Sequence, residues 1–215
     1  MKTEDLIQKL SIDLVPTKPM QSPLRMTAIF SSIGLVLIGA SFFMMSSRID
    51  LKEQLSNPKF FFEIGISFLL ALAALALSTF LSRPGQQDKT KKLEKLCVGF
   101  LALVLLYDGF KVAQLSQSQI HLGMNLSGIE CFASVLGYSI MLGAAVMFWL
   151  RKGASTNPRL SGLVIGTACV AMGNVSITFF CGIDNGMHIF LWHFILPMLA
   201  ALILGVTASR FLLKW

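Results

Sequence analysis

Long apolar runs separated by short polar segments are the dominant pattern of the chain. Because a helix rises ~1.5 Å per residue, about 18 consecutive apolar residues cross the ~30 Å hydrocarbon core of a bilayer. In lipid each backbone polar group must be satisfied within its segment, so uninterrupted runs of this length predict helices rather than barrel strands. Six such runs occur, at 27–45, 61–82, 96–115, 131–150, 160–181 and 187–209. We therefore predict an all-α, polytopic membrane protein in which residues 27–215 form a bundle of six transmembrane helices.

The segment 1–26 has a different pattern, that of a short amphipathic helix. One apolar stripe recurs at helical spacing and consists of Leu6, Ile7, Leu10 and Leu14. A helix this short is marginal in water and needs a surface to lie on. Two interpretations stay open at this point. The helix lies on the membrane or on the bundle, or it folds into an apolar groove of a soluble partner.

Composition and charge agree with the membrane assignment and orient the bundle. Only 13% of the residues are charged, whereas soluble domains have about 25%. Of the 18 Lys and Arg residues, all but Arg48, Lys52, Lys59 and Lys111 fall in the tail, the second and fourth loops and the carboxyl end. Basic loops are retained in the cytoplasm during insertion, which predicts that both termini are cytoplasmic. This distribution explains the net charge of +7 without binding to nucleic acid.

Two cysteines are placed for chemistry on the side opposite the termini. Cys131 opens the fourth run and Cys181 closes the fifth. The two spans are antiparallel neighbours, so both thiols are expected at similar depth near the outer interface. A disulfide requires Cα atoms within ~7 Å, which neighbouring helices permit and sequence spacing does not prove. An oxidising compartment favours such a bond, and the alternative is that both cysteines are small packing residues.

The three histidines of the chain lie on the same outer side and raise the question of a metal. Thiolates with His121, His188 or His193 are a donor set for zinc, copper or a cadmium-like ion. The spacing gives little support, because no C-x-x-C motif occurs and residues five apart do not share a face of an α-helix. A transition or heavy-metal ion at the outer face is therefore an open expectation, beside the alternative of solvated or hydrogen-bonded histidines.

Polar and small residues inside the spans predict two further contacts. Asp108 and Lys111 are three residues apart on one face of the third span. A charge at mid-helix costs about 2.5–3.5 kcal/mol in insertion experiments, so we predict an intramembrane ion pair between them, with a relay as the alternative. Gly162 and Gly166 form a small-xxx-small pair that permits close helix contact.

Several stretches together resemble the NrsF family, the negative regulators of sigma F. They are "MKTEDLIQKLSIDLVP", "NPKFFFEIGISFLLALAALALSTFLSRPG", "GIECFASVLG", "FFCGIDNGMHIFLWHFILPMLAALILG" and the final "FLLKW". The resemblance implies a six-span protein of the bacterial inner membrane whose cytoplasmic tail holds an extracytoplasmic-function sigma factor. It also implies that Cys131 and Cys181 act together as stress sensors. The chain departs from the family pattern at Phe180, where a histidine is common, and in "CGID", which replaces a "CPED"-like turn.

The sequence therefore predicts a membrane anti-sigma factor rather than an enzyme. It has no P-loop, no G-x-S-x-G elbow and no H-E-x-x-H motif. The expected partners are the sigma factor, bound through the apolar stripe of the tail, and the lipid bilayer, with release when the two cysteines meet oxidative or heavy-metal stress. The alternative is a membrane thiol-redox protein linked to a quinone or to haem, since histidines near one edge are potential haem ligands.

Overall fold

The computed structural model describes residues 21–83, 85, 87–153, 155 and 157–213. The stripe of Leu6, Ile7, Leu10 and Leu14 lies outside these residues, so its helix stays a prediction. The long helices are α2 (Pro23–Met44), α4 (Pro58–Leu81), α5 (Gln87–Ala113), α7 (Ile129–Leu150), α8 (Pro158–Thr178) and α10 (Leu196–Leu212). The short elements are α3 (Leu51–Gln54), α6 (Gln117–Gly123), η1 (Leu126–Gly128), α9 (Gly186–His188) and the π-helix η2 (Ile189–Ile195).

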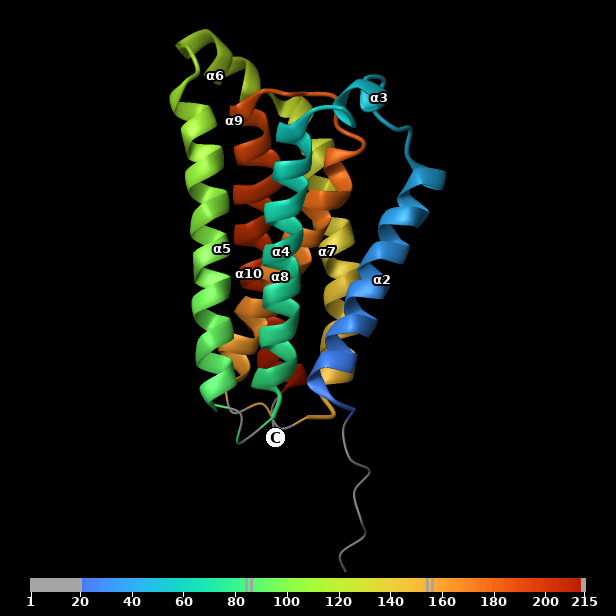
Figure 1. Ribbon diagram of the computed structural model, residues 1–215, viewed down its shortest axis with the longest axis vertical. Coiled ribbons are helices and arrows are strands. Elements are labelled where there is room, and N and C mark those ends of the chain that lie inside the picture. The colour runs from blue at the N-terminus through green and yellow to red at the C-terminus, as the bar shows by residue number, and fades with distance from the viewer. Residues whose placement is uncertain (1–20, 84, 86, 154, 156, 214–215) are drawn as a thin grey trace, which may run out of the picture.

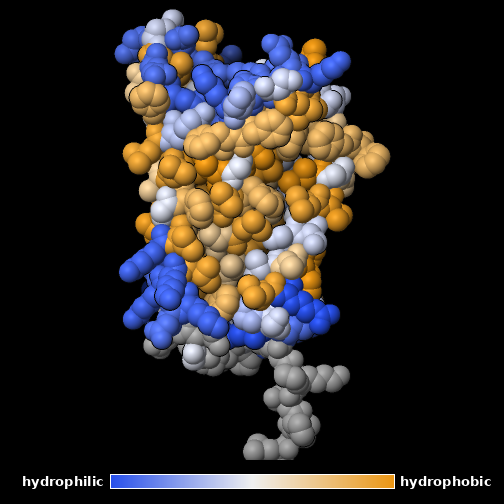
Figure 2. Space-filling model, in the orientation of Figure 1, coloured by the Kyte–Doolittle hydropathy of each residue, from blue (hydrophilic) through white to orange (hydrophobic). Residues whose placement is uncertain are grey.

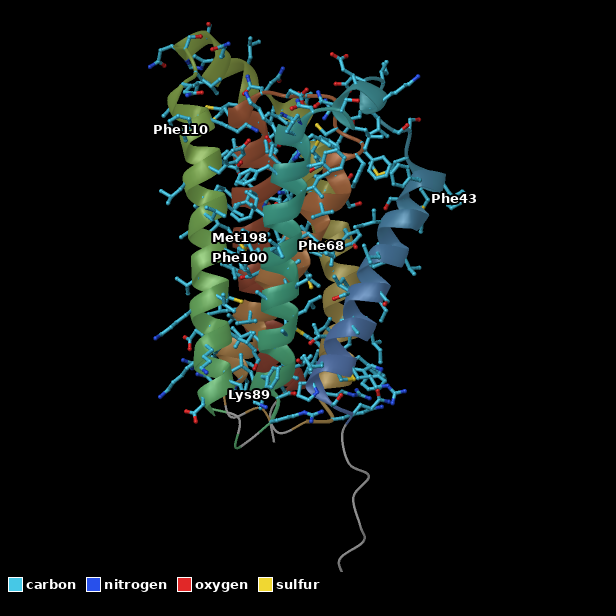
Figure 3. All side chains as sticks on the ribbon, viewed as in Figure 1. Phe43, Phe68, Lys89, Phe100, Phe110 and Met198 are labelled. Carbon is cyan, nitrogen blue, oxygen red and sulfur yellow. The ribbon has the colours of Figure 1, made fainter. Side chains whose placement is uncertain are left out.

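Among the described residues, six helices are long and apolar enough to cross a membrane, which confirms the predicted all-α, six-span fold. They stand side by side in one bundle (Figure 1), and an apolar belt separates two polar ends (Figure 2). Large apolar side chains point outward from this belt. Phe43 is 93% exposed and Phe110 63%, and both project away from the bundle (Figure 3). Such exposure is costly in water and favourable against lipid.

The helix starts explain why three spans begin earlier than their apolar runs. Ser22, Asn57 and Asn157 each accept a hydrogen bond from a backbone N–H of the first turn, and a proline follows each of them. A polar cap satisfies one of the free N–H groups, and proline at the first position needs none. The boundary is therefore set by local capping rather than by hydrophobicity.

α8 is the central helix of the bundle. Its most apolar 18-residue stretch is 83% buried, against 11% for that of α5, and it packs against α4, α7 and α10. A Cβ added to Gly162 would lie 2.3 Å from the carbonyl oxygen of Gly205, and one added to Gly166 would lie 2.8 Å from that of Ala201. The predicted small-residue pair thus brings α8 into backbone contact with α10.

The two ends of the bundle differ in charge. One end, here called the loop end, is formed by α3, α6 and the 179–188 turn, while the first and last described residues lie at the opposite, terminal end (Figure 1). Lys89 marks the terminal end (Figure 3), where Figure 2 shows a dense polar patch. The helix bounds place Lys89 in the first turn of α5, Arg151 directly after α7 and Arg159 in the first turn of α8, so these predicted basic residues gather at the terminal end.

The sixth span is irregular where Pro197 enters it. Proline cannot donate to the carbonyl four residues earlier, that of His193, and its ring clashes with that carbonyl in a regular α-helix. The chain widens into the π-helix η2 over Ile189–Ile195 before α10 resumes. A π-helix has i→i+5 hydrogen bonds and more residues per turn than an α-helix, so residues five apart lie closer to one face than they do in an α-helix.

Candidate functional site

Two thiols and two imidazoles converge at the loop end. The ligand atoms of Cys131, Cys181, His188 and His193 all lie within 4.8 Å of one another. The two sulfurs are 3.5 Å apart, and the Cys181 sulfur is 3.6 Å from Nε2 of His188. The His188 and His193 rings meet edge to face, with centroids 5.3 Å apart. We call these four residues the thiol–imidazole cluster.

Three separate pieces of chain build the cluster. Cys131 lies in the first turn of α7, and Cys181 follows α8, where its N–H donates to the carbonyl of Ile177. Asn185 then caps α9 by accepting from the N–H groups of Met187 and His188. The π-helix places His193 on the same side of the helix as His188. The expectation that residues five apart point in different directions is therefore wrong here. In the sequence, Pro197 is the feature that could have predicted this irregular turn.

The cluster is largely removed from solvent. Cys181 is 8% exposed, His188 1% and His193 2%, while Cys131 is half-buried. The hydrogen bond that the Cys131 thiol donates lowers the pKa of the Cys181 thiol, with smaller contributions from both histidines, while burial acts in the opposite direction. Of the two thiols, Cys181 is the one whose ionisation these contacts favour. Thiolate is the form that attacks oxidants and binds soft metals.

His121 does not belong to the cluster. It lies exposed on α6, outside the group whose ligand atoms converge. The predicted set of five metal donors is corrected to four. Trp192 of the π-helix reaches this region instead, since its indole N–H donates to the carbonyl of Gly123 and a Cβ on Gly128 would overlap its ring. This contact holds the segment before Cys131 against the sixth span.

A buried arginine holds the turn that carries Cys181. Arg48 is 6% exposed, and its guanidinium donates to Asp50 at 2.7 Å and to Asp184 at 2.8 Å. Its backbone N–H also donates to the carbonyl of Phe179. The guanidinium keeps the pKa of the Asp50 carboxyl below its usual range. Sequence reasoning used Arg48 only as a loop charge, because nothing in the chain indicates a partner 136 residues away.

Replacing Arg48 by glutamine should loosen this turn. A neutral amide cannot bridge two carboxylates with charge-assisted bonds, so we expect Cys181 to react several-fold faster with a charged maleimide. Peptide mass spectrometry separates labelling of Cys181 from that of the other cysteines. Lys52→Gln, at an exposed position on α3, is the matched control and should leave the rate unchanged. Equal rates in both variants would contradict the role of Arg48.

The predicted pairing of Asp108 with Lys111 is wrong. Lys111 Nζ lies 2.7 Å from Glu63 Oε1 on α4, and the Tyr107 hydroxyl donates to the same oxygen at 3.2 Å. Asp108 is buried, and the part of the chain that the structure describes offers it no ion pair. Spacing places Asp108 and Lys111 on one face of α5, but Lys111 reaches the neighbouring helix because the carboxylate there is closer.

A polar cavity of about 210 Å³ connects these groups with the cluster. It lies among α4, α5, α8 and the 179–188 turn. Glu63, Lys111 and Asp184 line it together with Asp108, and it reaches Cys181 and His193. Water and small solutes therefore have a route from the polar groups of the loop end to two members of the cluster.

Comparison with known proteins identifies the family of the chain. The family model described as "Negative regulator of sigma F" matches residues 10–215. A "Probable anti-sigma-F factor NrsF" of Azospira oryzae (strain ATCC BAA-33 / DSM 13638 / PS) is 26% identical over 220 residues, covering 100% of both chains. No solved structure matches. The match spans all six helices and the cluster, and the chain therefore belongs to the NrsF family of negative regulators of sigma F.

Proposed function

We propose that this protein holds an extracytoplasmic-function sigma factor at the bacterial inner membrane and releases it when Cys131 and Cys181 meet oxidative or heavy-metal stress. Family membership gives the coarse function, negative regulation of a sigma factor, and with it a sigma factor as partner. We propose in addition that the sigma factor is of the extracytoplasmic-function type, that the membrane is the bacterial inner membrane, and that the two cysteines are the sensor.

One observation carries the sensor: two thiols 3.5 Å apart at the end of the bundle opposite the termini. Fourteen of the 18 Lys and Arg residues fall in the tail, the second and fourth loops and the carboxyl end, and this bias supports assigning the terminal end to the cytoplasm. The thiols then face the periplasm, which is an oxidising compartment. α2, the first described helix, begins at the terminal end, so we assign the sequence before it to the side where a sigma factor is available.

Oxidation joins the two sulfurs within a short movement. A disulfide has an S–S length of about 2.05 Å, so the sulfurs must approach by roughly 1.5 Å. With hydrogen peroxide as oxidant, the two thiols lose two electrons and two protons, the S–S bond forms, and the peroxide O–O bond breaks to give two molecules of water. A thiophilic metal ion would instead bind both sulfurs. Either event links α7 to the turn after α8.

The helices offer a path from the cluster to the terminal end. Cys131 begins α7, Cys181 follows α8, and His193 precedes α10. α8 and α10 are in backbone contact through Gly162 and Gly205, and we expect them to move as one unit. A shift of α7 against this unit would change the arrangement of the helix ends at the terminal end.

The tail contact is tested by charge substitution. Leu6→Asp with Leu10→Asp puts two carboxylates on the apolar stripe, and burying them unpaired is strongly unfavourable. We expect the variant to lose co-purification of the sigma factor from native membranes. Gln8→Asp, on the opposite side of the predicted helix, should retain it. Retention of the sigma factor by the stripe variant would reject this contact.

The thiol-redox alternative is separated by a spectrum. A strong Soret band in the purified protein would indicate a haem protein and overturn the proposed function. The donors of the cluster converge on one point, which suits a single ion better than the faces of a macrocycle.

A further inference from the structure

We propose that the thiol–imidazole cluster is a four-coordinate Cys₂His₂ site for one soft or borderline divalent ion of the zinc class, held by the reduced protein. Its ligands are Cys131, Cys181, His188 and His193. The regulatory consequence rests on the proposed function, whereas the binding of the ion does not.

The spacing of three of the four donors is close to that of a tetrahedral site. Zinc binds thiolate at about 2.3 Å and imidazole at about 2.0–2.1 Å, which puts two sulfurs about 3.8 Å apart and sulfur about 3.5 Å from nitrogen. The cluster has 3.5 Å between sulfurs and 3.6 Å between Cys181 Sγ and His188 Nε2. These atoms therefore need little movement to surround an ion.

One buried polar atom of the cluster lacks a hydrogen-bond partner. Nε2 of His193 is buried and has no hydrogen-bond partner among the described residues, although the residue is only 2% exposed. Buried polar atoms are nearly always satisfied, and an orphan of this kind points to an ion or water. The nitrogen belongs to one of the four converging side chains.

Charge favours the same occupant. Two thiolates are costly to bury at the edge of a bilayer. A divalent ion with two thiolates and two neutral imidazoles is neutral overall, so the complete site can be buried where its parts cannot. The cation also favours deprotonation of both thiols.

The fold supplies both a scaffold and an entrance. The π-helix places His188 and His193 on one face, and π-turns inside helices are frequent at functional sites. The 210 Å³ cavity reaches Cys181 and His193, and its wall includes the carboxylates of Glu63 and Asp184. A hydrated cation entering from the loop end meets these oxygen atoms before it reaches the sulfur.

A resident ion changes what the sensor responds to. Oxidation of the two bound thiolates to a disulfide transfers two electrons to the oxidant and expels the divalent ion. A softer ion that binds thiolate more tightly displaces it by ligand exchange without electron transfer. Oxidants and thiophilic metals then act through one event, loss of the resident ion.

The test uses the full chain, purified in detergent under reducing conditions and supplied with zinc or cobalt alone. We expect about one zinc ion per chain after dialysis. Cobalt should show thiolate-to-metal charge transfer and the intense visible bands of tetrahedral coordination. His188→Ala and His193→Ala should each weaken zinc affinity at least tenfold, and His193→Cys should restore binding with a cobalt spectrum shifted toward three sulfurs.

Two matched controls guard against unfolding and adventitious binding. His121→Ala removes an exposed histidine from the same end, and Cys169→Ser removes a buried thiol outside the cluster. Both should bind zinc like the unmodified chain. The proposal is overturned if the unmodified chain binds no zinc or cobalt, or if binding survives loss of both cluster histidines. Metal binding without metal- or oxidant-dependent release would contradict the proposed function alone, and thiol-dependent release without metal binding would contradict this inference alone.

Discussion

Cys181→Ser abolishes stress-dependent release of the sigma factor and leaves sequestration intact. This is the expected result because a serine hydroxyl at that position can neither form a disulfide nor bind a soft metal ion. The hydroxyl is close in size to the thiol, so the turn held by Arg48 should keep its fold. The tail is not altered and continues to bind its partner.

The measurement is the amount of sigma factor retained on membranes before and after treatment with peroxide or cadmium. Release should fall to background in Cys181→Ser and in Cys131→Ser, since either change removes one half of the pair. Cys169→Ser is the matched control, because that cysteine is buried in α8 away from the cluster, and it should respond normally. Unchanged release in both cluster variants would discard the thiol mechanism.

Gly162→Ala destabilises the bundle by about 1–3 kcal/mol, the usual cost of overpacking a tight contact. The added Cβ would lie 2.3 Å from the carbonyl oxygen of Gly205 and 2.6 Å from the Ser209 hydroxyl. Backbone cannot yield as a flexible side chain does, so α8 and α10 must separate. The expected result is a lower free energy of unfolding in mixed micelles, together with a lower midpoint temperature.

Gly137→Ala is the control for this prediction, since it makes the same substitution in a neighbouring span. No described atom lies within 4 Å of a Cβ built on Gly137, and alanine has the higher helix propensity. We expect Gly137→Ala to be neutral or slightly stabilising. Equal stability of the two variants would show that α8 and α10 do not rely on this backbone contact.

The six spans could be predicted because their signal is local. Length and apolarity alone decide whether a segment can satisfy its backbone inside a bilayer, and every predicted run overlaps a long helix of the bundle. The exact starts at Pro23 and Pro58 depended on capping by Ser22 and Asn57. These signals are present in the sequence but weaker than hydrophobicity.

The cluster was only half predictable. Antiparallel neighbouring spans place Cys131 and Cys181 at one depth, and that argument needs no side-chain contact. His193 belongs to the cluster only because of the π-helix before Pro197, and sequence alone does not predict that helix. His121 lies outside the cluster because its position on α6 is exposed, which also required the structure. A regular helix was the reasonable assumption, and one extra residue in a turn was enough to change which histidines share a face.

Partners in the bundle interior were the least predictable feature. Spacing alone paired Lys111 with Asp108, whereas the nearer carboxylate is Glu63 on another helix, and Arg48 finds Asp184 across the bundle. The sequence by itself determined the number of spans, the charge difference between the ends and the end at which the thiols lie, because these follow from transfer between water and lipid. Only the tertiary structure decided which charges pair and which donors converge, because those choices depend on distances of a few ångströms between segments far apart in the chain.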